Sequence, residues 1–239
     1  VKCLSENYNG HDSPTLNTAF FDIETDFDAS RGFADPSDPF MPITAISVHL
    51  QWLDLLVTLV IPPKAMRSGE GLIEAQRICD QFENTELYLN EGDMLNDFLD
   101  VIEDADVLTG WNSEGYDIPY TVNRITRILS KSHTRKMCLW DLHPQKRKVM
   151  KYGKEQETFD LFGRIHLDYL ELYRKYTYHE MHSYALDTIG AHEVGEQKVA
   201  YEGTLDQLYN NDFYKFVAYN RQDVALLDKI DKKLRFIEL

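Results

Sequence analysis

Residues 18–24 of this chain read Thr-Ala-Phe-Phe-Asp-Ile-Glu, a short apolar run that contains two acids. Such a run is typical of a buried β-strand. Because side chains alternate between the two faces of a strand, Asp22 and Glu24 would share one face and Ile23 would lie on the other. Two adjacent carboxylates beside apolar residues repel each other and lose solvation, and a divalent cation would remove both costs. A lone Asp-x-Glu pair is nevertheless more often an ordinary surface feature.

Other apolar runs predict further strands. Residues 43–50 alternate with period two, and residues 55–61 form a third run. Since modest connections join these runs to the first one, they predict an antiparallel meander. Residues 86–89 and 106–112 also have strand character. Two β-capable stretches around a glycine predict a hairpin over residues 148–159.

Helical signals alternate with these strands. Asn90 suits an N-cap, and the apolar residues that follow it keep a helical spacing up to Ala105. Pro119 suits the first turn of a second helix. The last quarter of the chain is helical, and from Leu205 to the end this pattern is broken only near residues 210–211. This alternation predicts an α/β fold in one domain over residues 18–239, after an extended leader at residues 1–17.

Composition limits the possible classes of protein. With 239 residues and 43% hydrophobic content, the chain can bury one good-sized core. No apolar run approaches the roughly 20 residues that span a bilayer, so we expect no membrane partner. The first residues include neither Met nor an apolar signal region, which suggests a processed chain or a piece of a longer one. Three widely spaced cysteines favour a reduced, cytoplasmic compartment without disulfides.

The net charge of -15 is unfavourable for binding nucleic acid. Its distribution is uneven, however, because residues 124–154 carry ten Lys or Arg against a single acid, Asp141. A local basic stretch can guide a phosphate backbone while the rest of the protein stays acidic. A solvated loop region is an equally good interpretation of this stretch.

Two later segments add acids in unusual places. Asp117 follows a predicted strand and loop and comes just before Pro119, where an ordinary N-cap is the simpler interpretation. Tyr219 and Asp223 are four residues apart on the apolar face of the last helix, so they stack one turn apart. An ionised Asp on an apolar stripe needs a metal or a partner, or else it becomes neutral. A salt bridge to a nearby Lys or Arg is the alternative to a metal.

In order and spacing, these motifs resemble those of the DEDD superfamily of 3′-5′ exonucleases, in the subtype with Tyr in the third motif. They are most similar to the proofreading domain of family B DNA polymerases, especially those of T-even-type phages. The resemblance runs from about Ala19 to the C-terminus. It is carried by Phe21-Asp22-Ile23-Glu24, Gly110-Trp111-Asn112, Tyr116-Asp117-Ile118-Pro119-Tyr120 with Asn123-Arg124, Ser183-Tyr184-Ala185-Leu186-Asp187, and Tyr219-Asn220 with Asp223-Val224.

The resemblance implies an RNase H-like fold, with a mixed central sheet flanked by helices and an inserted β-hairpin. It implies two divalent ions, Mg²⁺ or Mn²⁺, that hydrolyse the terminal phosphodiester of single-stranded or frayed DNA. Asp22, Glu24 and Asp223 would hold the ion that activates the attacking water. Asp22 would bridge to the second ion, with Asp117 assisting there. Tyr219 would orient the water.

The resemblance also implies DNA contacts, which we assign to Asn112, Tyr120, Arg124, Lys148 and Lys198. For Lys198 we regard surface exposure as the stronger alternative to a place near the scissile phosphate. Phe27, Phe33 and Tyr120 could stack on terminal bases, although most aromatic residues are simply core. The hairpin at 148–159 could separate primer from template, or it could be a plain surface hairpin.

Two alternatives stay open at this level. The same acids serve ribonucleases, so the substrate could be RNA. A non-catalytic module that binds single strands or a polymerase is a further alternative. Because polymerase motifs are absent from the chain, the expected partners are a DNA 3′ end and the remaining polymerase domains or a polymerase subunit. If the chain is encoded by a phage, the compartment is the host cytoplasm.

Overall fold

A six-stranded sheet in the order β4-β3-β2-β1-β5-β8 forms the centre of the protein. The computed structural model describes residues 15–151 and 153–239. Strands β1 to β3 are antiparallel neighbours, which confirms the predicted meander, while β4, β5 and β8 each join a neighbour in parallel. The strands are β1 Thr18–Thr25, β2 Ile43–Leu50, β3 Leu55–Val60, β4 Thr85–Leu87, β5 Val107–Gly110 and β8 Ile165–Asp168.

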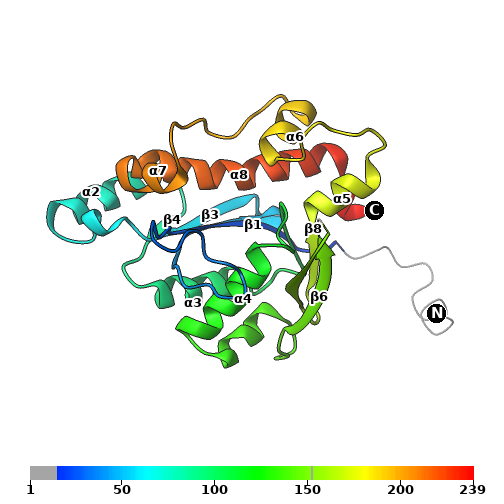
Figure 1. The fold of residues 1–239 in the computed structure, drawn as a ribbon, viewed down its shortest axis with the longest axis horizontal. Coiled ribbons are helices and arrows are strands. Elements are labelled where there is room, and N and C mark those ends of the chain that lie inside the picture. The colour runs from blue at the N-terminus through cyan, green and yellow to red at the C-terminus, as the bar shows by residue number, and fades with distance from the viewer. Residues whose placement is uncertain (1–14, 152) are drawn as a thin grey trace.

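Helices cover both faces of this sheet (Figure 1). The long helix α8 contacts β1, β2 and β3 on one face, and α3 contacts β2 and β3 on the other. The helices are α2 Gly69–Cys79, α3 Glu91–Val101, α4 Asp117–Ile128, α5 Tyr169–Tyr176, α6 Leu186–Glu193, α7 Leu205–Asn211 and α8 Phe213–Leu234. Short 3₁₀ turns occupy Gln51–Leu53, Lys64–Met66, Lys131–Met137 and Phe236–Glu238. The mixed α/β architecture expected of an RNase H-like domain is thereby confirmed.

Strand β1 separates two apolar cores. Phe21 and Ile23 pack into the core that includes α3 and α4, whereas Phe20 packs with residues of α5, α6 and α8. Since a strand turns alternate side chains to opposite faces, Asp22 and Glu24 lie on the α8 side. The sheet therefore delivers the two acids into an otherwise apolar layer.

The predicted hairpin is present and slightly longer than expected. It consists of β6 Gln145–Lys151 and β7 Lys154–Asp160, which form their own two-stranded sheet. Gly153 in its turn has a φ of 74°, a conformation that glycine adopts without strain. In Figure 1 the hairpin lies at the lower right, beside β8.

The structure also contains elements that were not predicted, namely β8, α2 and α5. The predicted leader lies mostly outside the described residues, since only residues 15–17 of it are described. Asn17 belongs to the fold, because its backbone oxygen accepts from the amides of Asp106 and Val107.

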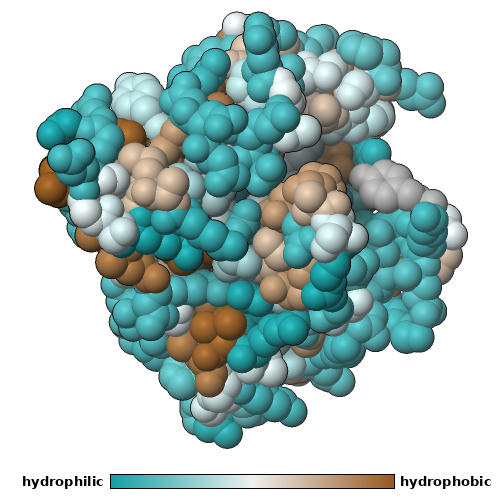
Figure 2. All heavy atoms as spheres, turned by 60° about the vertical axis from the view of Figure 1, so that its left-hand side comes forward, coloured by the Kyte–Doolittle hydropathy of each residue, from teal (hydrophilic) through white to brown (hydrophobic). Residues whose placement is uncertain are grey.

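None of the described helices is long and apolar enough to cross a membrane. Hydrophilic side chains cover most of the face shown in Figure 2, and the hydrophobic patches on it are small and separated.

Arg164 joins three segments from inside the protein. Its side chain is only 2% exposed and donates hydrogen bonds to five backbone oxygens that follow α3 or lie in the turn Lys131–Met137. The accepting oxygens are those of Ile102 (2.7 Å), Glu103 (2.9 Å), Ala105 (2.7 Å), Lys136 (3.0 Å) and Met137 (3.3 Å). A guanidinium thus satisfies carbonyls that the end of a helix leaves without partners.

Replacing Arg164 with Met should therefore lower the free energy of unfolding by about 3 kcal/mol or more, because several buried carbonyls lose their donor. Chemical denaturation measures this loss. Arg77→Met is the matched control, since Arg77 is exposed and, among the described residues, its side chain pairs with Glu74 on its own helix, and we expect about 0.5 kcal/mol or less there. Equal losses in the two variants would contradict the assigned role.

His166 predicts a pH dependence of stability. Its Nε2 lies 2.9 Å from Ser113 Oγ, and burial lowers the pKa of the imidazole to about 4. The unfolded chain takes up the proton near pH 6.5 and the folded chain does not, so this residue costs stability as pH falls from about 6.5 to 4. Between pH 7 and pH 5, the stability of the protein relative to His166→Gln should fall by about 1 to 2 kcal/mol. A difference that stays constant with pH would refute this prediction.

Candidate active site

Strand β1 supplies the first two acids. Asp22 lies opposite Ser47 of β2, and Glu24 lies opposite Ala45. Ile23 is 3% exposed and belongs to the core on the other face. The prediction that the two carboxylates share one face of a strand is confirmed.

Helix α8 supplies the third acid and the tyrosine. Asp223 is 2% exposed and Tyr219 is 9% exposed, one turn earlier on the buried side of the helix. Carboxylate oxygens of Asp22, Glu24 and Asp223 all lie within 4.8 Å of one another. Two segments about 200 residues apart in sequence thus meet where α8 crosses β1.

Asp117 contacts strand β1 at the edge that faces β5. Strand β5 pairs with β1 only as far as Phe20, because β5 ends at Gly110. The amide of Ile23 is therefore free of the ladder and donates to Asp117 Oδ1 at 3.2 Å. Asp117 is the first residue of α4 and Tyr116 is its N-cap, so the capping interpretation of Asp117 is wrong.

The loop that carries Asp117 depends on a close approach at Gly110. A Cβ at this position would lie 2.7 Å from the backbone oxygen of Phe21, which only glycine avoids. Asp168 then holds the loop, since its carboxylate accepts from the amides of Asn112 (3.0 Å) and Glu114 (3.2 Å). No sequence motif marks Asp168 for this role.

Burial raises the pKa values of all four acids, and repulsion within the group adds to the rise for two of them. Desolvation, reinforced by the neighbouring carboxylates, raises the pKa of Asp22 well above its usual value and that of Glu24 to about 8. Desolvation raises the pKa of Asp117 to about 7 and that of Asp223 to about 6. The site therefore concentrates negative charge that the fold alone compensates poorly.

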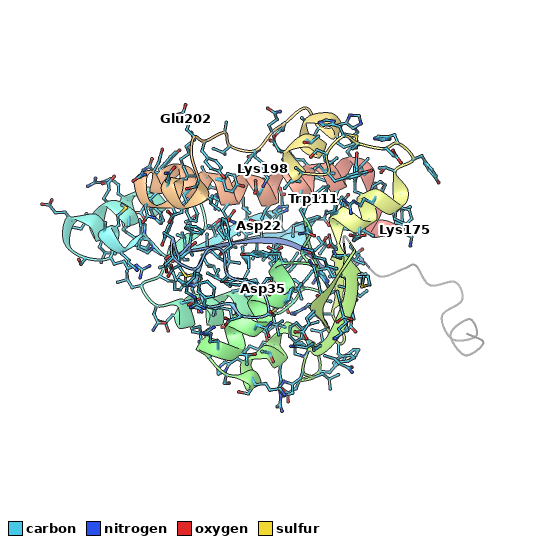
Figure 3. All side chains as sticks on the ribbon, viewed as in Figure 1. Asp22, Asp35, Trp111, Lys175, Lys198 and Glu202 are labelled. Atoms are coloured by element: carbon cyan, nitrogen blue, oxygen red, sulfur yellow. The ribbon has the colours of Figure 1, made fainter. Side chains whose placement is uncertain are left out.

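Lys198 is the cation that faces this charge. Its ammonium forms an ion pair with Asp223 and donates to the Tyr219 hydroxyl at 3.1 Å. Figure 3 shows Lys198 beside α8 and Asp22 on the strand below it. The expectation of surface exposure was wrong, because the 195–204 segment folds over α8 and the backbone amide of Lys198 is bound by Asp187. The salt bridge that we considered as the alternative to a metal at Asp223 is thus present.

The donor set suits a divalent metal ion. Asp223 Oδ1 is buried and has no hydrogen-bond partner in the described part of the chain. Hard divalent cations take carboxylate oxygens as ligands, and a single Lys cannot satisfy three such groups. Asp22, Glu24 and Asp223 are therefore the residues that could hold a metal, with Asp117 nearby at the edge of β1 that faces β5.

The predicted DNA contacts differ in accessibility. Tyr120 is fully buried and donates to the backbone oxygen of Met41, and Arg124 is buried against Glu91 with both of its terminal nitrogens bonded. Neither side chain is available to a ligand, because both anchor α4. Lys148 is exposed and pairs with Glu155 across the hairpin. Asn112 lies in the loop before Asp117, with a φ of 60°.

The basic stretch at residues 124–154 is largely neutralised within the fold. Lys151 is buried against Asp168, and Arg147 pairs with Glu114 and Asp160. Lys136 and Lys146 pair with Asp100 and Glu157. Apart from Asp141, which pairs with Arg135, the acids that neutralise the stretch lie outside it, so the sequence composition of residues 124–154 alone could not reveal them.

The exposed aromatic residues near the site lie in the loop after β1. Phe27 and Phe33 pack against each other with ring centroids 4.9 Å apart, and Phe33 remains 71% exposed. Tyr201 packs edge-on against Tyr219, with ring centroids 5.3 Å apart. Tyr201 was not singled out in the sequence, where no motif marks it.

Comparisons with known proteins identify related chains. A family described as "DNA polymerase family B, exonuclease domain" matches residues 1–189. The DNA-directed DNA polymerase of Escherichia phage RB69 is 31% identical over 99% of this chain and 28% of its own length. That of Enterobacteria phage T4 is 32% identical over 63% of this chain and 17% of its own length. The DNA polymerase catalytic subunit of Saimiriine herpesvirus 2 is 28% identical over 77% of this chain and 18% of its own length. This chain therefore spans less than a third of each of these relatives.

Removing the Lys198 charge should lower the stability of the folded protein when no divalent ion is present. In EDTA, Lys198→Met should lower the free energy of unfolding by about 1 to 3 kcal/mol, because buried Asp223 loses its counter-charge. Added Mn²⁺ should restore more stability to this variant than to the unmodified chain, as thermal unfolding will show. Lys229→Met is the matched control, because Lys229 forms an exposed pair with Glu196. Identical behaviour of the two variants would contradict the prediction.

Proposed function

Because this chain belongs to the exonuclease-domain family of family B DNA polymerases, we propose that it is a 3′-5′ exonuclease acting on single-stranded or frayed DNA. It would hydrolyse the terminal phosphodiester. One observation carries the proposal, namely that carboxylate oxygens of Asp22, Glu24 and Asp223 lie within 4.8 Å of one another. Convergent carboxylates are what metal-assisted hydrolysis of a phosphodiester requires.

Two divalent ions, Mg²⁺ or Mn²⁺, would supply the positive charge that stabilises the attacking and leaving oxygens of an in-line displacement. Asp22, Glu24 and Asp223 would hold one ion, and Asp22 with Asp117 would hold the other. The raised pKa values support this assignment, because they report negative charge that the surrounding protein leaves uncompensated.

Tyr219 and Lys198 have separate tasks in this proposal. Burial raises the pKa of the Tyr219 phenol, so it stays protonated at neutral pH and can orient the attacking water through a hydrogen bond. Lys198 carries a positive charge beside Tyr219 and can neutralise a non-bridging oxygen of the scissile phosphate. Both side chains come from the α8 side of the site.

The partner would be the remainder of a DNA polymerase, in which the chain would act as the proofreading part. The relatives support this, since they are named DNA polymerases and the chain spans only a fraction of each. Among the predicted DNA contacts, Asn112, Lys148 and Lys198 remain our candidates. The relatives from phages RB69 and T4 lead us to place the reaction in the cytoplasm of a host cell.

A DNA oligomer labelled at its 5′ end tests the proposal. With Mg²⁺ or Mn²⁺, the chain should produce a ladder that shortens from the 3′ end, and EDTA should abolish the ladder. Asp22→Ala and Asp117→Ala should each reduce the rate by about a thousandfold or more, because metal-assisted charge stabilisation is lost. Circular dichroism should show that both variants stay folded.

Glu86→Gln is the control substitution, since Glu86 is an exposed acid on the edge strand β4, and it should retain full activity. Full activity in Asp22→Ala would refute the assigned site. An RNA oligomer of the same sequence is tested in parallel, and faster cleavage of RNA would overturn the choice of DNA. Saturable Mn²⁺ binding with no cleavage of either oligomer would instead favour a non-catalytic binding module.

A further inference from the structure

Four polar side chains form a straight row across the sheet beneath α8. Asp22 lies opposite Ser47, Ser47 opposite Thr58, and Thr58 opposite Thr85, so β1, β2, β3 and β4 each contribute one residue. Residues in register on adjacent strands share one face of a sheet, and this face packs against α8. The three hydroxyl residues are buried, with exposed fractions of 0% for Ser47, 0% for Thr58 and 9% for Thr85.

Two residues of α8 connect the members of this row. Asn220 accepts from Ser47 Oγ at 2.6 Å and donates through Nδ2 to Asp22 Oδ2 at 2.9 Å. Ser47 Oγ lies 2.9 Å from Thr58 Oγ1. Arg221 donates through Nη1 to Thr58 Oγ1 at 3.0 Å and to Thr85 Oγ1 at 2.9 Å. A continuous chain of hydrogen bonds thus runs from a guanidinium to the Asp22 carboxylate.

Proton count fixes the direction of this chain. A hydroxyl has one proton to donate, and Ser47 gives its proton to the Asn220 carbonyl oxygen. Ser47 must therefore accept from Thr58, and Thr58 accepts from Arg221, which can only donate. At the far end, the Asn220 Nδ2 group can only donate, so Asp22 Oδ2 is the acceptor. Each bond from Arg221 through Thr58, Ser47 and Asn220 thus points toward Asp22, and hydrogen bonds aligned in this way polarise and strengthen one another.

Simple packing does not require this arrangement. Apolar side chains fill the same layer. Ala45 lies two residues from Ser47 on β2, and Val60 lies two residues from Thr58 on β3, so both face α8 as well. Elsewhere in the sheet, Thr109 on β5 is fully buried, and its hydroxyl has no partner among the described residues. A buried threonine therefore keeps its place in this sheet without such a chain.

We propose that Asn220, Ser47, Thr58 and Arg221 are positioning residues that hold the Asp22 carboxylate in its metal-binding orientation. The inference rests on the proposed function, because Asp22 is one of the proposed metal ligands. It assigns a role to Asn220 and Arg221, the two residues that follow Tyr219. Helix α8 then has two roles. It brings Tyr219 and Asp223 to the site. Through Asn220 and Arg221 it also orients Asp22 on strand β1.

Mn²⁺ affinity measured by isothermal titration calorimetry tests the proposal without relying on cleavage. Ser47→Ala should raise the Kd for Mn²⁺ about tenfold, and Thr58→Val, one hydrogen bond further away, about threefold, because hydrogen-bonded partners of a ligand tune its affinity. Thr58→Ser keeps the hydroxyl and should stay within about twofold of the unmodified chain. Thr109→Val is the matched control for changing a buried threonine to valine, and it should leave the Kd unchanged.

Equal Kd values for Thr58→Val and Thr109→Val would overturn the positioning role. So would a Thr58→Ser variant as impaired as Thr58→Val, since the hydroxyl would then not be the cause. If Thr58→Val fails to fold, Ser47→Ala decides in its place, and an unchanged Kd there refutes the proposal. If the unmodified chain itself binds no Mn²⁺, both the metal centre of the proposed function and the positioning role fail. Normal binding by all variants refutes the positioning role alone.

Discussion

The electrostatic cost of gathering Asp22, Glu24, Asp117 and Asp223 around one strand governs the design of this domain. Burial raises the pKa of each, repulsion within the group adds to the rise at Asp22 and Glu24, and the ion pair with Lys198 offsets only part of this cost. The surrounding fold must therefore hold these groups in place by other means. It does so with two apolar cores, one on each side of β1, which keep the strand and α8 in contact.

Specific backbone features give the acids their positions inside this frame. Strand β5 stops at Gly110, which leaves the Ile23 amide free to bind Asp117. Asp168 holds the loop that joins Gly110 to Asp117. The Asn220 side-chain amide holds one oxygen of Asp22. Each of these contacts joins segments that are far apart in sequence. The site is thus a product of the sheet and its crossing helix, and no single motif forms it alone.

Much of the fold could be predicted because its signals are local. The period-two pattern at 43–50, the cap at Asn90 and Pro119 in a first turn depend only on neighbouring residues. Strand β8 was missed because Ile165–Asp168 is short and half polar. The basic stretch at 124–154 was misleading, since acids from distant segments neutralise much of it and α4 buries Arg124.

The sequence by itself determined which acids would share a face, because strand and helix periods are fixed by backbone geometry: Asp22 with Glu24, and Asp223 one turn after Tyr219. Only the tertiary structure decided what meets those acids. Lys198 faces Asp223, Asp117 binds the Ile23 amide, and a hydrogen-bonded row ends on Asp22. The reason is that these partners lie on different elements, and their distances depend on strand order, register and the crossing of α8, which no local pattern encodes.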